Sequence, residues 1–237
     1  MTVSTEGHTV RRYDGELNHL HYLVLEMGSL VLSQVRDAVE ALNRRDVSLA
    51  QTVIGRENAV DLGEVNADSE IVKLIARRCP VGGDLRLVFA VAKSVTDLER
   101  IGDEAVKIAT LGLHLFGSDT GGADPNRLLL RDIASMASLA LRHLECGLQI
   151  IDSWDAGKAM ELIQAHQTLD EEFQAGLRRL LTFVMEDARN IGFAVNIVLI
   201  IKALERIGDH ARNLAEYVVY QVRGQDIRHL AEHHHAA

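Results

Sequence analysis

Proline is nearly absent from this 237-residue chain, which contains only Pro80 and Pro125. Because proline interrupts helices, its scarcity leaves long helices free to form. Aromatic residues are also few, at 4%, whereas hydrophobic residues as a whole make up 47%. A core filled mainly by aliphatic side chains is typical of helical bundles.

The chain also lacks the marks of a secreted or membrane-spanning protein. Its first residues contain no apolar core, so we expect no signal peptide. The longest strongly apolar stretch, residues 191–201, is too short to cross a bilayer and is expected to form a buried helix. Cys79 and Cys146 form no CxxC motif, so we expect two buried free thiols in a reducing cytoplasm.

Basic residues are outnumbered by acidic ones, and the formal net charge is −9. Phosphate backbones are bound by basic surfaces, so this balance argues against nucleic acid as a partner. Short arginine pairs, such as Arg44-Arg45, are expected at solvated helix ends, where cations complement the helix dipole.

One hexapeptide, Leu-Glu-Arg-Ile-Gly-Asp, occurs at residues 98–103 and again, 106 positions later, at residues 204–209. Upstream the same similarity continues with a shift of 109, which relates Met27 to Met136. Because the shift changes from 109 to 106, three residues have been gained or lost between the two segments. We therefore infer that the chain is an internal duplication.

The sequence divides into two similar domains, at residues 14–117 and 126–229, joined by a Gly- and Asp-rich linker. Apolar residues recur at spacings of three and four, which favours helices over strands. We predict an all-α fold of two tandem three-helix bundles. The predicted helices are residues 16–42, a segment from an Asp46 N-cap to 78, a third capped by Asp84, and then 127–153, 155–186 and 188–223.

Acidic residues recur at equivalent positions in the two halves. Glu99 and Asp103 are four residues apart, hence on one helix face, and Glu205 and Asp209 repeat this pair. Such pairs also occur on ordinary solvated helices, where nearby arginines form weak salt bridges with them. The second predicted helix of each half carries a further pair, so the candidate ligands comprise Glu57, Asp61, Glu99, Asp103, His166, Asp170, Glu205 and Asp209.

Two costs accompany this arrangement. Like charges four residues apart destabilise a helix by about 0.2–0.5 kcal/mol, and a glycine inside a helix costs about 1 kcal/mol relative to alanine. Gly102 and Gly208 lie between the acids, where they would let a neighbouring helix or a bound ion approach closely. A cation held by the carboxylates would reverse the charge penalty.

The ligand types indicate which cations would suit the site. Carboxylate oxygens favour Mg, Mn, Ca or Fe, and the nitrogen of His166 widens the second site toward Zn or Fe. His166 is equally compatible with a role as a surface histidine. His210, which follows Asp209, is expected to make a polar contact rather than to bind metal.

The chain resembles the PhoU family of phosphate-signalling regulators over about residues 14–229. The resemblance rests on both hexapeptides, on Glu205–His210 as an extended copy, on Gly83–Leu87 and on residues 222–229. It implies tandem three-helix bundles whose E(D)xxxD motifs hold metal clusters in some members. These motifs fall on the same acids, except that His166 replaces a usually acidic residue.

The resemblance implies a cytoplasmic, dimeric, metal-binding adaptor rather than an enzyme. It would negatively regulate phosphate uptake and the phosphate-starvation response by coupling the ATPase subunit of a high-affinity phosphate ABC transporter to a sensor histidine kinase. Membrane association would occur only through these partners. Two alternatives remain: a carboxylate-bridged metal hydrolase or oxidase, and a metal-free helical scaffold.

Overall fold

The computed structural model describes residues 11–117, 127–186 and 191–227, which contain eight α-helices and no strand. The predicted all-helical fold is therefore confirmed, with similar helices in each half. The first half contains α1 (Arg11–Arg44), α2 (Val47–Gly55), α3 (Glu57–Arg78) and α4 (Gly82–Gly117). The second half contains α5 (Arg127–Ser153), α6 (Ala156–Ala165), α7 (Gln167–Glu186) and α8 (Ile191–Arg223).

The second predicted helix of each half is broken into two. In the first half, the amide of Arg56 bonds to the Val53 carbonyl, three residues back. In the second half, the amide of Leu169 bonds to the His166 carbonyl at 2.9 Å, again three residues back. These tighter turns replace the four-residue bonds of an α-helix and mark the junctions α2/α3 and α6/α7. The prediction of one continuous second helix in each half is therefore wrong.

Helix caps agree with the sequence in part. The Asp46 carboxylate accepts a hydrogen bond from the amide of Leu49 at 3.0 Å, as expected of an N-cap. The prediction that Asp84 caps the next helix is wrong, because α4 begins at Gly82 and contains Asp84 in its first turn. There the Asp84 carboxylate accepts a hydrogen bond from the Tyr13 hydroxyl at 3.0 Å instead.

The core is formed by the predicted apolar stripes, nearly all of whose residues are buried. Two positions along these stripes, Ala92 and Val198, are only half-buried, and they occupy equivalent places in the two halves. The expectation of buried thiols is wrong: Cys79 is exposed at the end of α3, and Cys146 is half-buried. None of the described helices is both long and apolar enough to span a membrane.

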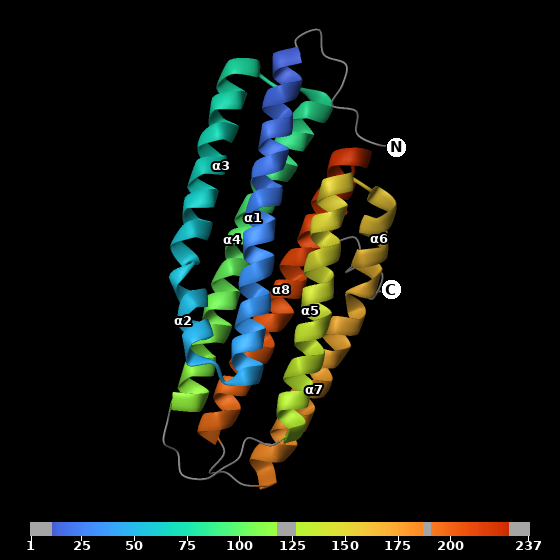
Figure 1. The fold of residues 1–237 in the computed structure, drawn as a ribbon. Helices are drawn as coiled ribbons and strands as arrows, with labels where there is room; N and C mark the ends of the chain where they lie inside the picture. Colours follow the sequence, from blue (N-terminus) through green and yellow to red (C-terminus); the bar gives the residue numbers. More distant parts are fainter. Residues whose placement is uncertain (1–10, 118–126, 187–190, 228–237) are drawn as a thin grey trace, which may run out of the picture.

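The two halves lie side by side as one elongated bundle (Figure 1). The central contact joins α4 to α8, and α1 contacts α5. Contacts along α4 and α8 run from Arg86 with the Gln221 carbonyl to Glu104 with Arg206, so these helices are antiparallel. This packing sets the positions of the acids that α4 and α8 carry.

Candidate metal centre

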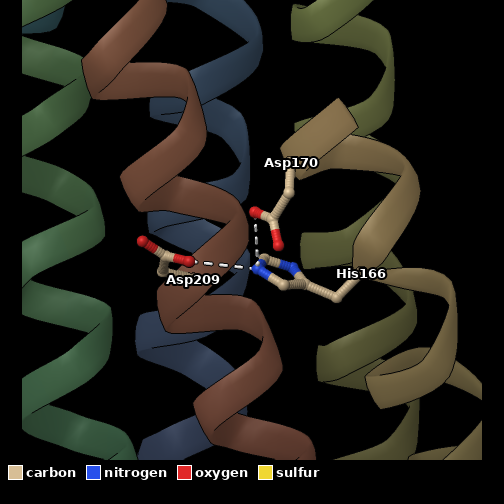
Figure 2. A group of neighbouring side chains, drawn as sticks. All are labelled: His166, Asp170 and Asp209. Atoms are coloured by element: carbon tan, nitrogen blue, oxygen red, sulfur yellow. Dashed lines mark hydrogen bonds and ion pairs between the residues drawn. The ribbon is translucent and has the colours of Figure 1, made fainter. Parts of the chain in front are cut away.

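The second half brings three of the predicted ligands together. His166 lies at the α6/α7 junction, Asp170 follows one turn later on α7, and Asp209 projects from α8 (Figure 2). The Nε2 atom of His166 lies 3.0 Å from Oδ1 of Asp209 and 3.5 Å from Oδ1 of Asp170. All three ligand atoms lie within 4.8 Å of one another, a spacing compatible with one bound cation.

Burial within this trio is uneven. The His166 side chain is only 3% exposed, whereas those of Asp170 and Asp209 are 53% and 41% exposed. Burial by itself would raise the pKa of Asp209, but the hydrogen bond from His166 and the nearby charges of His166 and Arg212 outweigh it and lower that pKa. The trio thus combines an anchored imidazole with two carboxylates that an ion can reach from solvent.

A glycine allows this approach of helices. A Cβ atom built at Gly208 would lie 2.0 Å from Cδ2 of Leu169 and 3.7 Å from Cε1 of His166. The equivalent Gly102 would bring a Cβ to 3.2 Å from Cγ1 of Val60. The glycines of the hexapeptides therefore serve the close approach of a neighbouring helix, one of the two reasons that the sequence suggested.

The first half gathers its acids more loosely. Burial raises the pKa of Glu99 and of Asp103, and nearby carboxylates, Asp61 among them, raise both further. Glu57 begins α3. Throughout the described part of the chain, the second-half trio is the one group of three such residues with ligand atoms this close.

Two further acids qualify the sequence prediction. Glu205 is not part of the trio, because its carboxylate pairs with Lys202 on the same helix. Glu64 was missed, although burial raises its pKa and Asp68, Asp61 and Asp103 raise it further. Glu64 lies three residues after Asp61, so the helical spacing already contained that signal.

Three nearby cationic residues, which could have formed ordinary salt bridges with the predicted ligands, pair with other acids. Arg206 contacts Glu104 at 2.7 Å, and Lys107 lies 3.4 Å from the same residue. Arg212 pairs with Glu216 at 3.3 Å. His210 is confirmed as a polar contact, since its Nδ1 lies 2.7 Å from Oδ1 of Asp97.

A second histidine, His143 on α5, lies next to His166. Its ring centroid is 5.8 Å from that of His166, and the two ring planes meet at 78°. Its Nδ1 lies 2.9 Å from the Leu139 carbonyl. Burial lowers its pKa most strongly, against the opposing effect of the Leu139 and Ala165 carbonyls. The sequence analysis missed this residue.

The family model described as the PhoU domain matches residues 24–111 and 133–218 of the chain. A "Phosphate-specific transport system accessory protein PhoU homolog" from Pseudomonas aeruginosa is 41% identical over 96% of this chain and 92% of its own length. The corresponding PhoU protein of Escherichia coli is 33% identical over 97% of this chain and 92% of its own length.

Solved structures agree with these relatives. The crystal structure of PhoU from Pseudomonas aeruginosa superposes with a TM-score of 0.83 and 40% identity, covering 90% of this chain and 100% of that one. The phosphate transport system regulatory protein PhoU from Streptococcus pneumoniae gives a TM-score of 0.81 and 28% identity, covering 90% and 98%. These names describe accessory and regulatory proteins and no catalytic activity, in agreement with the prediction that the chain is not an enzyme.

Proposed function

The chain belongs to the PhoU family, and we propose from this that it is a cytoplasmic accessory protein of phosphate-specific transport that restrains phosphate uptake. The observation that carries the proposal is the match of the PhoU domain to both halves, together with relatives named for that transport system. In this role the protein, as a homodimer, couples the transporter ATPase to a sensor histidine kinase. Any contact with the membrane is made through these partners.

The test of this role is genetic and biochemical. Deleting the gene is expected to raise phosphate uptake and to switch on a phosphate-starvation reporter in phosphate-rich medium, and the wild-type gene is expected to reverse both effects. Tagged protein is expected to retain the ATPase subunit and the kinase. Unchanged uptake and an unchanged reporter after deletion would contradict negative regulation.

We further propose that the trio of His166, Asp170 and Asp209 binds a divalent cation. One imidazole nitrogen and two carboxylate oxygens fit Zn, Mn or Fe, and the exposed carboxylates leave room for water or a further ligand. Two carboxylates near one cation would also lose their mutual repulsion. The acids of the first half, Glu99 and Asp103 among them, are proposed to hold a second, all-oxygen site.

Metal binding is tested by thermal unfolding of metal-stripped protein. A cation at 100 times its dissociation constant is expected to add about 2.7 kcal/mol to the free energy of unfolding, and chelator is expected to remove that gain. Asp209→Asn should reduce the gain from the second half, and Asp132→Asn, which alters an acid paired with Arg179, is the control. Equal gains in Asp209→Asn and wild type would exclude Asp209 as a ligand.

A further inference from the structure

Two buried ring nitrogens, one in the trio and one on the neighbouring histidine, have no hydrogen-bond partner: Nδ1 of His166 and Nε2 of His143. A buried polar atom without a partner costs about 1–3 kcal/mol, so each of the two needs an explanation. Both belong to rings that face one another edge to face, with centroids 5.8 Å apart. In the first half, the residue equivalent to His143 also has one buried atom without a partner.

In the first half the position equivalent to His143 is Gln34, 109 residues earlier, and this side chain is fully buried. Its Nε2 donates to the Val53 carbonyl at 3.2 Å, beside the break between α2 and α3, while its Oε1 has no partner. Both halves therefore place a buried polar side chain from their first helix, each with one unpartnered atom, near the break in their second helix. A polar side chain repeated at equivalent positions indicates a role shared by the two positions.

The hydrogen-bonding partners define which nitrogen carries the proton. Nδ1 of His143 faces a carbonyl oxygen, so in the neutral ring Nδ1 holds the proton and Nε2 is a bare acceptor. Nε2 of His166 faces the Asp209 carboxylate, so in the neutral ring Nε2 holds the proton and Nδ1 is bare. With both rings neutral and no cation bound, the two unpartnered nitrogens are thus both acceptors.

A cation at Nε2 of His166 changes this arrangement. If a cation were held at Nε2, that nitrogen would coordinate through its lone pair and the neutral ring would carry its proton on Nδ1, with no net gain or loss of protons. Nδ1–H then needs an acceptor, and Nε2 of His143 is an acceptor without a partner. Histidines that bind metal nearly always donate their other ring N–H to a neighbouring hydrogen-bond acceptor, and this bond fixes the orientation of the ring.

We propose that His143 is a positioning residue for the metal centre and accepts a hydrogen bond from Nδ1–H of His166 when a cation is bound. The inference rests on the proposed metal site. The order of groups is then the Leu139 carbonyl, His143, His166 and the cation. Burial of both side chains keeps the two rings beside one another.

The test follows His166 by nitrogen-15 NMR during titration of metal-free protein with Zn²⁺ alone. In wild type, Zn²⁺ is expected to convert His166 from the Nε2–H form to a form ligated through Nε2 and protonated at Nδ1. His143 is expected to keep its proton on Nδ1 throughout. A proton on Nε2 of His143, donated to the nearby Ala165 carbonyl, would overturn the proposal without a variant.

Variants give the second measurement, with Zn²⁺ affinity read from the His166 signals. His143→Leu removes the acceptor and is expected to weaken binding about 10–100-fold. His143→Gln, which copies Gln34 and supplies an amide oxygen, is expected to restore affinity close to that of wild type. His21→Leu is the matched control, because His21 is another largely buried histidine with an unpartnered Nδ1, placed beside Trp154. Its affinity should equal that of wild type.

The outcomes separate the two proposals. If Zn²⁺ left the His166 signals of wild type unchanged, the metal site itself would be refuted and this inference with it. If Zn²⁺ bound wild type and a folded His143→Leu equally well, the metal site would stand and the role of His143 would be refuted. Equal weakening in His143→Leu and His143→Gln would also refute it, since the amide supplies an acceptor.

Discussion

Asp97 shows how one buried residue connects the two halves. It is 2% exposed on α4, yet its carboxylate accepts hydrogen bonds from side chains of α8. The Tyr217 hydroxyl donates to it at 2.6 Å, and Nδ1 of His210 lies 2.7 Å away. A buried carboxylate is tolerated only when such partners satisfy it.

Replacing Asp97 with alanine is expected to destabilise the protein, because it removes the buried carboxylate that the Tyr217 hydroxyl and the His210 ring contact. The cost is about 1–3 kcal/mol for each buried hydrogen bond lost in this way. Urea denaturation would measure it. Asp97→Asn keeps an acceptor oxygen and should cost less, and Asp97→Ala as stable as wild type would contradict the prediction.

Glu99 gives a prediction about pH in the metal-free protein. Burial first, and then Asp103, Glu64 and Asp61, raise its pKa above the ordinary value of 4.5. The folded state therefore holds this proton more tightly than the unfolded state, so the stability it contributes is present below pH 4.5 and is lost as the pH rises through the raised pKa.

Glu99→Gln, which mimics the protonated side chain, is accordingly expected to be more stable than wild type at pH 7 and equally stable at pH 4. Melting temperatures across this range would check the sign. Glu70→Gln is the control, because a hydrogen bond from Lys73 lowers the pKa of Glu70. That variant should not be stabilised at pH 7, and equal responses of the two would refute the electrostatic account.

At the scale of elements, glycine on α8 decides how closely α7 can approach. Gly208 costs helix stability locally, but a side chain there would meet the fully buried Leu169. The local penalty and the packing gain therefore act in opposite directions.

Gly208→Ala is expected to lose about 1–3 kcal/mol, since overpacking of a dense core outweighs the gain in helix propensity. Gly15→Ala on α1, where a Cβ meets nothing within 4 Å, should instead gain about 0.5–1 kcal/mol. Denaturant unfolding of both variants provides the comparison. In a Leu169→Ala background the Gly208→Ala penalty should shrink, and an unchanged penalty would show that Leu169 is not its cause.

At the scale of the whole molecule, the antiparallel contact between α4 and α8 joins the duplicated halves into one body. Besides the Asp97 contacts, Arg206 pairs across it with the buried Glu104, and Phe89 meets the Tyr220 ring edge-on. Trp154 at the end of α5 lies 5.8 Å from the His21 ring of α1, so it also reports contact between the halves.

We expect metal-free protein to unfold in a single transition, because separation of the halves would expose this buried contact. Trp154 fluorescence and far-ultraviolet circular dichroism should give the same midpoint in urea. Two midpoints would show that the halves unfold independently.

The sequence by itself determined the helices, the duplication and the acids that share a helix face, because spacings of three and four are local properties of one helix. Only the tertiary structure decided which acids converge. In the folded chain, His166, Asp170 and Asp209 come together from two segments. Glu205 pairs with Lys202, and the His143 ring lies beside that of His166. The tertiary structure also broke the second helix of each half and paired Asp97 with His210. These outcomes depend on how helices distant in the chain pack together. The periodicity along one helix carries no information about that packing.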